Sequence, residues 1–145
     1  MTGLRHLLPI VTTLLLAMTA CRGESGPRPY RAASETMKYR ITPDPSPPIA
    51  RQRTLYKVVV QDRESNQPIE GGEGRIFAES RDGAKTFYPL TPGPELGTYY
   101  GTITYVLAGE WAVAIQFRRD STDSTSAIER IDWMQEVRGP ASDAP

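Results

Sequence analysis

Hydrophobic and polar residues alternate through most of the chain after Met37, with a period of two residues. The pattern is clearest between Tyr99 and Phe117, where the large apolar side chains occupy odd-numbered positions. These positions are Tyr99, Ile103, Tyr105, Leu107, Trp111, Val113, Ile115 and Phe117. Such alternation places side chains on one face of a strand, whereas a helix would distribute them around its circumference. We therefore predict two strands that share a buried face and fold back near Ala108–Glu110, with Trp111 in the core.

Shorter runs of the same kind precede this pair. They predict strands over residues 37–42, 54–61, 73–80 and 85–90, separated by polar or Asp-Gly turns at 62–67 and 81–84. The glycines around position 73, Gly71, Gly72 and Gly74, predict a bulge or a close backbone approach.

The segment 127–137 gives two signals. Ile131, Trp133 and Val137 alternate as in a strand, whereas Ser126 and Glu129 have the spacing of a helix capping box. We predict a closing strand, because the preceding strands leave edges that it would cover. A helix is the alternative.

About seven short strands with regularly spaced turns predict an all-β protein, a β-sandwich. We assign residues 36–138 to this domain. Residues 21–35 are polar, contain Pro27 and Pro29 and have almost no large apolar side chain, so they are predicted to be a flexible tether. Residues 139–145 are predicted to be a disordered tail.

The start of the chain has the layout of a secretion signal. Arg5 precedes the apolar run Leu7–Met18, which leads to the small residues Thr19 and Ala20. The apolar run has 12 residues, whereas a helix that spans a bilayer needs about 20. Residues 1–20 are therefore predicted to be a signal peptide rather than a permanent anchor.

The order Leu16–Cys21 resembles a bacterial lipobox, with Met18 where that motif usually has leucine. The resemblance implies that Cys21 becomes the lipidated N-terminus, which would hold the protein on the extracytoplasmic side of a membrane, the periplasmic side in a Gram-negative cell. The alternatives are an ordinary secretion signal followed by an unmodified cysteine, or a buried first helix.

Cleavage of the signal peptide and lipidation of Cys21 would remove side chains that could act in catalysis or bind a metal. Cleavage removes His6, the only histidine, and lipidation consumes the only thiol. No imidazole then remains for a nucleophile pair, and neither a His/Cys zinc site nor a disulfide framework is expected. Met37 and Met134 are too far apart in sequence to favour a copper site. We expect no cofactor, no metal and no enzymatic activity.

Charge gives little indication of a partner. The chain has 17 basic and 17 acidic residues, and loss of Arg5 leaves about one net negative charge. No basic stripe interleaves with aromatic residues, so nucleic acid is not an expected partner.

The alternating core also resembles a known family. The residues that carry the resemblance are Val58, Val60, Asp62, Gln67, Pro68, Ile69, Gly97, Tyr99, Gly101, Ile103, Gly109, Trp111, Val113 and Ile115. Over roughly residues 37–119 they resemble the YtkA-like and FixH-like domains of bacterial envelope proteins. The resemblance implies an immunoglobulin-like extracytoplasmic domain, of a kind sometimes found beside copper handling or oxidase assembly. The matching positions are fold determinants, so it assigns no functional residue.

Two functions remain open. In the first, the tethered domain binds another envelope protein through its loops or a strand edge, and an exposed edge with an apolar patch would favour this function. The alternative is a small-ligand or carbohydrate-binding accessory domain, which an aromatic-lined concavity would favour. Candidate surface-recognition residues are Tyr88, Tyr100 and Trp133, the aromatic side chains expected to be exposed, as the ligand-binding alternative requires; Tyr100 points away from the face that contains Tyr99.

Overall fold

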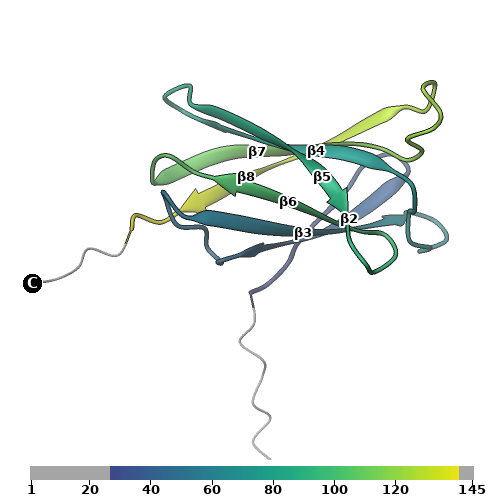
Figure 1. Ribbon diagram of the computed structural model, residues 1–145, viewed down its shortest axis with the longest axis horizontal. Helices are drawn as coiled ribbons and strands as arrows, with labels where there is room; N and C mark the ends of the chain where they lie inside the picture. Colours follow the sequence, from purple (N-terminus) through teal and green to yellow (C-terminus); the bar gives the residue numbers. More distant parts are fainter. Residues whose placement is uncertain (1–26, 141–145) are drawn as a thin grey trace, which may run out of the picture.

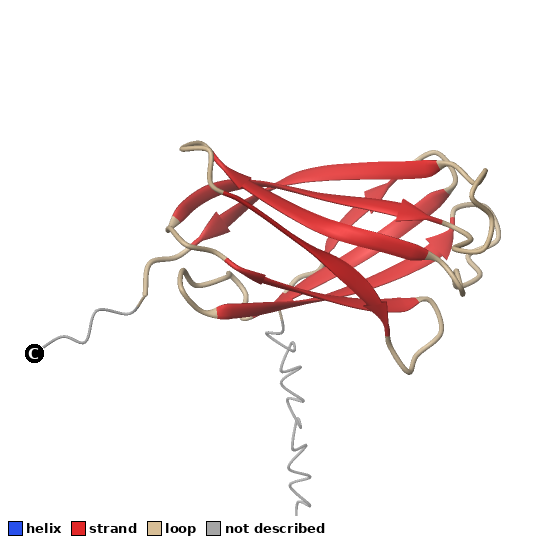
Figure 2. Cartoon of the chain, turned by 45° about the horizontal axis from the view of Figure 1, so that its top comes forward, coloured by secondary structure: helices blue, strands red, loops and turns tan. Residues whose placement is uncertain are grey.

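The computed structural model describes residues 27–140, which form antiparallel β-strands connected by loops (Figure 1 and Figure 2). The strands are β1 (Tyr30–Ala33), β2 (Met37–Asp44), β3 (Arg53–Asp62), β4 (Glu73–Ser80), β5 (Lys85–Pro92), β6 (Thr98–Thr104), β7 (Gly109–Arg118) and β8 (Ile128–Val137). Within this range the structure contains no helix long and apolar enough to cross a membrane. The prediction of an all-β fold is confirmed.

The strands form two layers that β5 connects. Their order is β1-β2-β3-β6-β5-β4-β7-β8, and β5 pairs with β4 along most of its length but with β6 at Thr91 and Pro92. One layer is therefore β1-β2-β3-β6 and the other is β5-β4-β7-β8, with their inner faces against each other. A further contact joins the two layers on the open side: Ile49, in the β2–β3 connection, and Arg138, just after β8, form a parallel bridge, so the sandwich is nearly closed into a barrel.

The core lies between the two layers, as the alternation predicts. Trp111 is 2% exposed, and its ring meets that of Tyr105 edge to face with centroids 5.1 Å apart. Its indole Nε1 donates a hydrogen bond to the Leu107 carbonyl at 3.1 Å. The expectation that Leu107 belongs to the core is wrong: β6 ends at Thr104, and the side chain of Leu107 lies in the following turn, 44% exposed.

Close backbone approach explains the glycines at the start of β4. A Cβ atom at Gly72 or at Gly74 would come within 2.5 Å of the Phe117 ring. The two glycines therefore let Phe117, fully buried, pack directly against the backbone of this segment.

The segment 127–137 is a strand, β8, which pairs with β7 along its whole length from Ile128 to Val137. The expectation that Trp133 is exposed is wrong, because its alternation with Ile131 and Val137 places it on the inner face, 9% exposed. Its ring stacks on that of Tyr30, with centroids 5.4 Å apart.

The predicted tether includes a strand. Residues 30–33 form β1 and pair with β2 in the register Tyr30↔Ile41 to Ala33↔Lys38. Few apolar side chains are needed for this, because β1 satisfies the free backbone groups of β2 at the sheet edge. The predicted signal peptide, Cys21 and residues 141–145 of the predicted tail lie outside the described residues.

The core also contains four buried tyrosines, Tyr39, Tyr56, Tyr99 and Tyr105, and burial raises the pKa of each, which links stability to pH. The hydroxyls of Tyr56 and Tyr105 are hydrogen-bonded to each other, and burial raises the pKa of both well above the usual value near 10. Burial also raises the pKa of Tyr39 to about 12. In the unfolded chain these phenols ionise near pH 10, whereas in the folded chain they keep their protons to higher pH.

We therefore expect the free energy of unfolding to be unaffected by these groups below pH 10. It should fall above pH 10, by about 1.4 kcal/mol per pH unit for each tyrosine that ionises only on unfolding. Urea denaturation at pH 9, 10 and 11 measures this slope, and Tyr39→Phe should reduce it. A profile that is flat between pH 10 and 11 would contradict the expectation.

Candidate functional site

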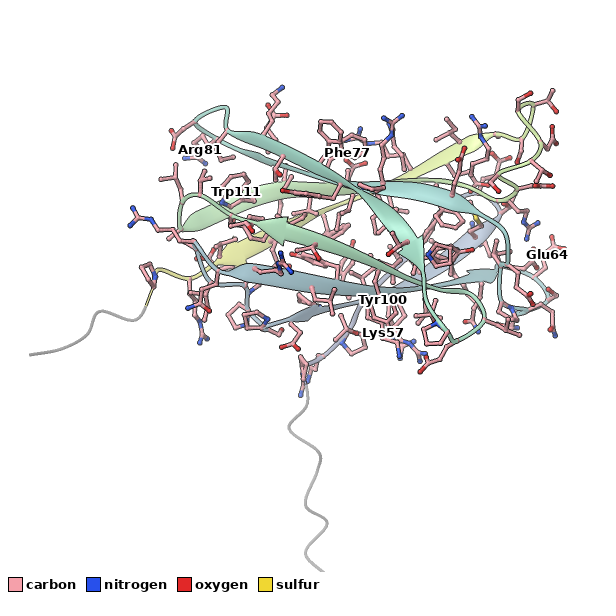
Figure 3. The ribbon with its side chains drawn as sticks, viewed as in Figure 1. Lys57, Glu64, Phe77, Arg81, Tyr100 and Trp111 are labelled. Carbon is pink, nitrogen blue, oxygen red and sulfur yellow. The ribbon has the colours of Figure 1, made fainter. Side chains whose placement is uncertain are left out.

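Two phenylalanines lie on the outer surface of the β5-β4-β7-β8 layer. Phe77 alternates with Ile76 and Ala78, which are buried, so its side chain points outward. Phe87 of β5 pairs directly with Phe77, their ring centroids are 6.1 Å apart, and Phe87 is 64% exposed. Figure 3 shows Phe77 on the opposite side of the molecule from Lys57 and Tyr100.

Other apolar side chains extend this surface, which we call the aromatic face. Its outward-pointing apolar members are Phe77, Phe87, Pro89, Ala112, Ala114, Ile128 and Met134, of which Phe77 is half-buried and Ala114 is only 3% exposed. Ile128 and Met134 are 52% and 62% exposed. An exposed aromatic and aliphatic group of this kind is typical of a binding surface when its members are adjacent rather than scattered.

Arg75 lies on the aromatic face beside the ring of Phe77. Its guanidinium carbon lies 5.5 Å from the centre of the Phe77 ring, a cation–π contact. The other basic side chains of this face make ion pairs, Lys85 with Glu79 at 3.0 Å, Arg118 with Glu73 at 3.3 Å and Arg130 with Asp132 at 2.6 Å. Arg75 makes no ion pair with any residue of the described range, so its charge remains available to a ligand.

The exposed ring of Phe87 separates two open hollows on this face. One has a volume of about 310 Å³ and is lined by Arg75, Phe87, Pro89, Arg118 and Ile128, among others. The second, of about 280 Å³, lies on the other side and includes Phe77, Phe87 and Ala114. Phe87 therefore projects between two depressions instead of lining a single deep pocket.

The three predicted recognition residues do not form one site. Tyr88 is 44% exposed on β5. Tyr100 is half-buried on the outer face of β6, as predicted, where its ring covers Gly93 closely enough that a Cβ atom there would be 2.5 Å from it. Trp133 belongs to the core.

Sequence reasoning missed Phe77 and Phe87, although a signal for Phe77 was present. The alternation that put Ile76 and Ala78 in the core requires Phe77 to point outward, by the same argument that placed Tyr100 outside. A large aromatic residue on the polar side of a strand is therefore the useful signal. Phe87 required the register of β5 against β4, which the sequence does not specify.

Metal-ligating side chains do not gather in the part of the chain that the structure describes. No cluster of three His, Cys, Asp or Glu residues occurs there. Met37 is fully buried in β2 and Met134 is exposed on β8.

The fold defines a class of two-layer, nearly closed antiparallel β-proteins. No family model matches the sequence, and no curated protein matches it. The resemblance to YtkA-like and FixH-like domains therefore stays a prediction.

Solved structures with a similar fold come from FetP of uropathogenic Escherichia coli strain F11. A copper-bound variant of FetP aligns with a TM-score of 0.57 and 13% identity, over 82% of this chain and 96% of the FetP chain. FetP expressed recombinantly in the periplasm of E. coli aligns with a TM-score of 0.56 and 13% identity, over 79% of this chain and 96% of the FetP chain. At this identity the likeness shows a shared fold.

Proposed function

We propose that the protein is a non-catalytic, extracytoplasmic module, tethered to a membrane through lipidated Cys21, that binds another envelope protein through the aromatic face. The observation that carries the proposal is the outward-facing Phe77–Phe87 pair, in which Phe87 is 64% exposed, with Arg75 beside it. Aromatic residues and arginine are enriched among the residues that contribute most to protein–protein binding energy. An extracytoplasmic location is compatible with FetP, which shares the fold and was expressed in the periplasm.

The shape of the aromatic face favours a protein partner over a small molecule. Small-ligand sites are concave and bury most of the ligand, usually in volumes of about 300–1,000 Å³. The larger hollow, at about 310 Å³, is at the lower end of that range and is open to solvent. Phe87 projects from the surface, which suits insertion into a pocket of a partner.

A small ligand remains the second candidate because of the larger hollow. Arg75 and Arg118 line it together with the ring of Phe87. This combination suits a small ligand with an apolar ring and an anionic group. Copper, which the FetP variant binds, is not proposed for this chain, since residues 27–140 contain neither histidine nor cysteine.

Site-specific photo-crosslinking in the native envelope tests the proposal. A photoreactive amino acid at Phe87 should give a discrete crosslinked protein, and the same group at Thr102, on the opposite outer face, should not. Arg75→Ala in the Phe87-labelled protein should reduce the yield. Equal products from both positions, or none from Phe87, would overturn the proposal; a small crosslinked adduct at Phe87 would favour the ligand alternative.

Binding to the crosslinked partner gives the quantitative test. We expect Phe87→Ala to weaken binding by about 2 kcal/mol or more, roughly 30-fold, as for an aromatic anchor at the centre of an interface. Its free energy of unfolding should change by less than about 1 kcal/mol, because Phe87 is 64% exposed. Isothermal titration calorimetry and urea denaturation measure the two quantities, and unchanged affinity would contradict the prediction.

A further inference from the structure

We propose that the outer face of the β1-β2-β3-β6 layer rests on the surface of a bilayer that contains anionic lipids. The proposal rests on the proposed tethering for the presence of the bilayer. It adds an orientation and a class of lipid, and it concerns the face opposite the aromatic face.

The outward-pointing side chains of this layer are predominantly basic, and we call the surface the basic face. The basic members on its strands are Arg31, Lys38, Arg40, Arg53 and Lys57, and the acidic member on its strands is Asp44. The outer face of the other layer has four basic residues, Arg75, Lys85, Arg118 and Arg130, and five acidic residues, Glu73, Glu79, Glu110, Asp132 and Glu136. A chain with balanced charge overall therefore has one strongly cationic face.

The charges of the basic face are largely unpaired. Lys57 makes an ion pair with Glu95 at 2.8 Å. None of the other four basic residues makes an ion pair within residues 27–140. Moreover, Arg31 and Arg40 lie directly opposite each other in the β1–β2 register, an arrangement of like charges that destabilises a sheet. An anionic surface would relieve this repulsion.

The uncharged side chains of the basic face also suit a lipid headgroup region. Leu55 is 40% exposed, and Tyr100 and Val59 are half-buried beside Lys57 and Arg40 respectively. Tyrosine is enriched at membrane–water interfaces because its ring is apolar and its hydroxyl is polar.

The chain leads from this side of the molecule toward the predicted anchor. The described residues begin at Pro27, which precedes β1, the edge strand of the basic layer, and Figure 1 shows this start below β3. Cys21 lies six residues earlier, a reach of at most about 20 Å when extended. Lipid at Cys21 would therefore hold the basic face near the headgroups, where attraction acts over about 8–10 Å at physiological salt.

Such docking would be intramolecular and would leave the aromatic face directed away from the bilayer, toward a partner. Each lysine or arginine near an anionic surface contributes about fivefold in affinity. The four unpaired basic residues, offset by the acidic residue Asp44, thus favour the docked orientation by roughly a hundredfold, less at high salt.

The chain supplies its own probes for this orientation. It has three lysines: Lys38 and Lys57 on the basic face, and Lys85 on the other layer. The full-length lipidated protein is reconstituted in nanodiscs of phosphatidylcholine alone or mixed with phosphatidylglycerol, and amine labelling is followed by mass spectrometry. We expect labelling of Lys38 and Lys57 to slow at least fivefold in the anionic nanodiscs, and that of Lys85 to stay unchanged.

Matched variants separate charge from general crowding by the membrane. Arg31→Gln with Arg40→Gln should remove most of the slowing of Lys38 and Lys57 labelling in anionic nanodiscs, because it lowers the preference for the docked orientation about 25-fold. Arg81→Gln with Arg130→Gln, which removes the same charge away from the basic face, should not. Three results would overturn the proposal. Lys38 and Lys57 could be protected equally in neutral and anionic nanodiscs, or in neither. They could also be protected only in native envelopes, where a protein would cover the basic face.

Failure of the anchor and failure of docking give different results. Without the anchor, the protein does not co-purify with the neutral phosphatidylcholine nanodiscs. In that case the unlipidated chain is added to anionic vesicles, and sedimentation with them at low salt but not at 0.5 M salt supports the basic face as a lipid surface. No sedimentation at low salt overturns it.

Discussion

Trp111→Ala is expected to lower the free energy of unfolding by about 3–5 kcal/mol, the usual cost of truncating a large buried aromatic residue. The side chain is 2% exposed and contacts Tyr105 edge to face. Its Nε1 also satisfies the Leu107 carbonyl and thereby fixes the turn between β6 and β7. Truncation would leave a cavity between the two layers and remove this hydrogen bond.

Urea denaturation followed by circular dichroism measures the effect of Trp111→Ala. Met134→Ala is the matched control, because Met134 is a large apolar residue of β8 that is 62% exposed, and its truncation should cost less than about 1 kcal/mol. If Trp111→Ala is too unstable to purify, Trp111→Phe should still destabilise the protein by more than the control. Equal stability of the Trp111 and Met134 variants would show that the odd-numbered face is not the core.

The part of the fold that the sequence predicts best is the part that depends on alternation. The long period-two series from Tyr99 to Phe117 determines β6 and β7, because a slip of one residue would expose every large side chain. The same signal in Ile131, Trp133 and Val137 correctly favours a strand over a helix for β8.

The parts that sequence reasoning missed depend on contacts between distant segments. β1 has four residues and is stabilised by pairing with β2 and by the stacking of Tyr30 on Trp133 across the closure of the sandwich. Composition describes these residues as a tether, since nothing local to them favours a strand. The same closure buries Trp133, whose exposure could not be judged without knowing that β1 lies beside β8.

The candidate site shows a related limit. Alternation places Phe77 and Tyr100 on outer faces, but these faces belong to different layers, and only the strand order separates them. The charge asymmetry has the same origin. The basic residues of the first layer lie at positions 31–57, whereas the basic and acidic residues of the second layer lie at positions 73–136. Along the chain these charges balance. They form one cationic face and one mixed face only because β3 pairs with β6 and β4 with β7, which places the two sets in different layers.

The proposed roles of the aromatic face and the basic face both depend on how the tether orients the domain relative to the bilayer. A partner can reach the aromatic face only if this face is directed away from the bilayer, and the basic face provides a reason for that orientation. A short linker to Cys21 favours the orientation because it restricts the domain to the headgroup region. The proposed orientation of the two faces therefore depends on the lipid anchor at Cys21.

Replacement of Cys21 is expected to move nearly all of the protein from the membrane fraction to the soluble fraction in 0.5 M salt. The comparison is between the native chain and a chain in which a cleavable signal without a lipobox replaces residues 1–20 and Cys21→Ala removes the lipid-bearing thiol. Two or three acyl chains hold a protein stably, whereas a single chain of about 14 carbons binds only marginally. Loss of the acyl chains leaves the basic face as the one remaining attachment in our proposal, and salt screens it.

Fractionation at two ionic strengths distinguishes the two attachments. We expect the lipidated protein to sediment with membranes in both low salt and 0.5 M salt, and to leave them in detergent. The Cys21→Ala protein should sediment partly in low salt and be released in 0.5 M salt, with unchanged urea denaturation, because residue 21 precedes β1 by nine residues. Retention of the Cys21→Ala protein in 0.5 M salt would show that the membrane holds it by something other than lipid at Cys21 or the charge of the basic face.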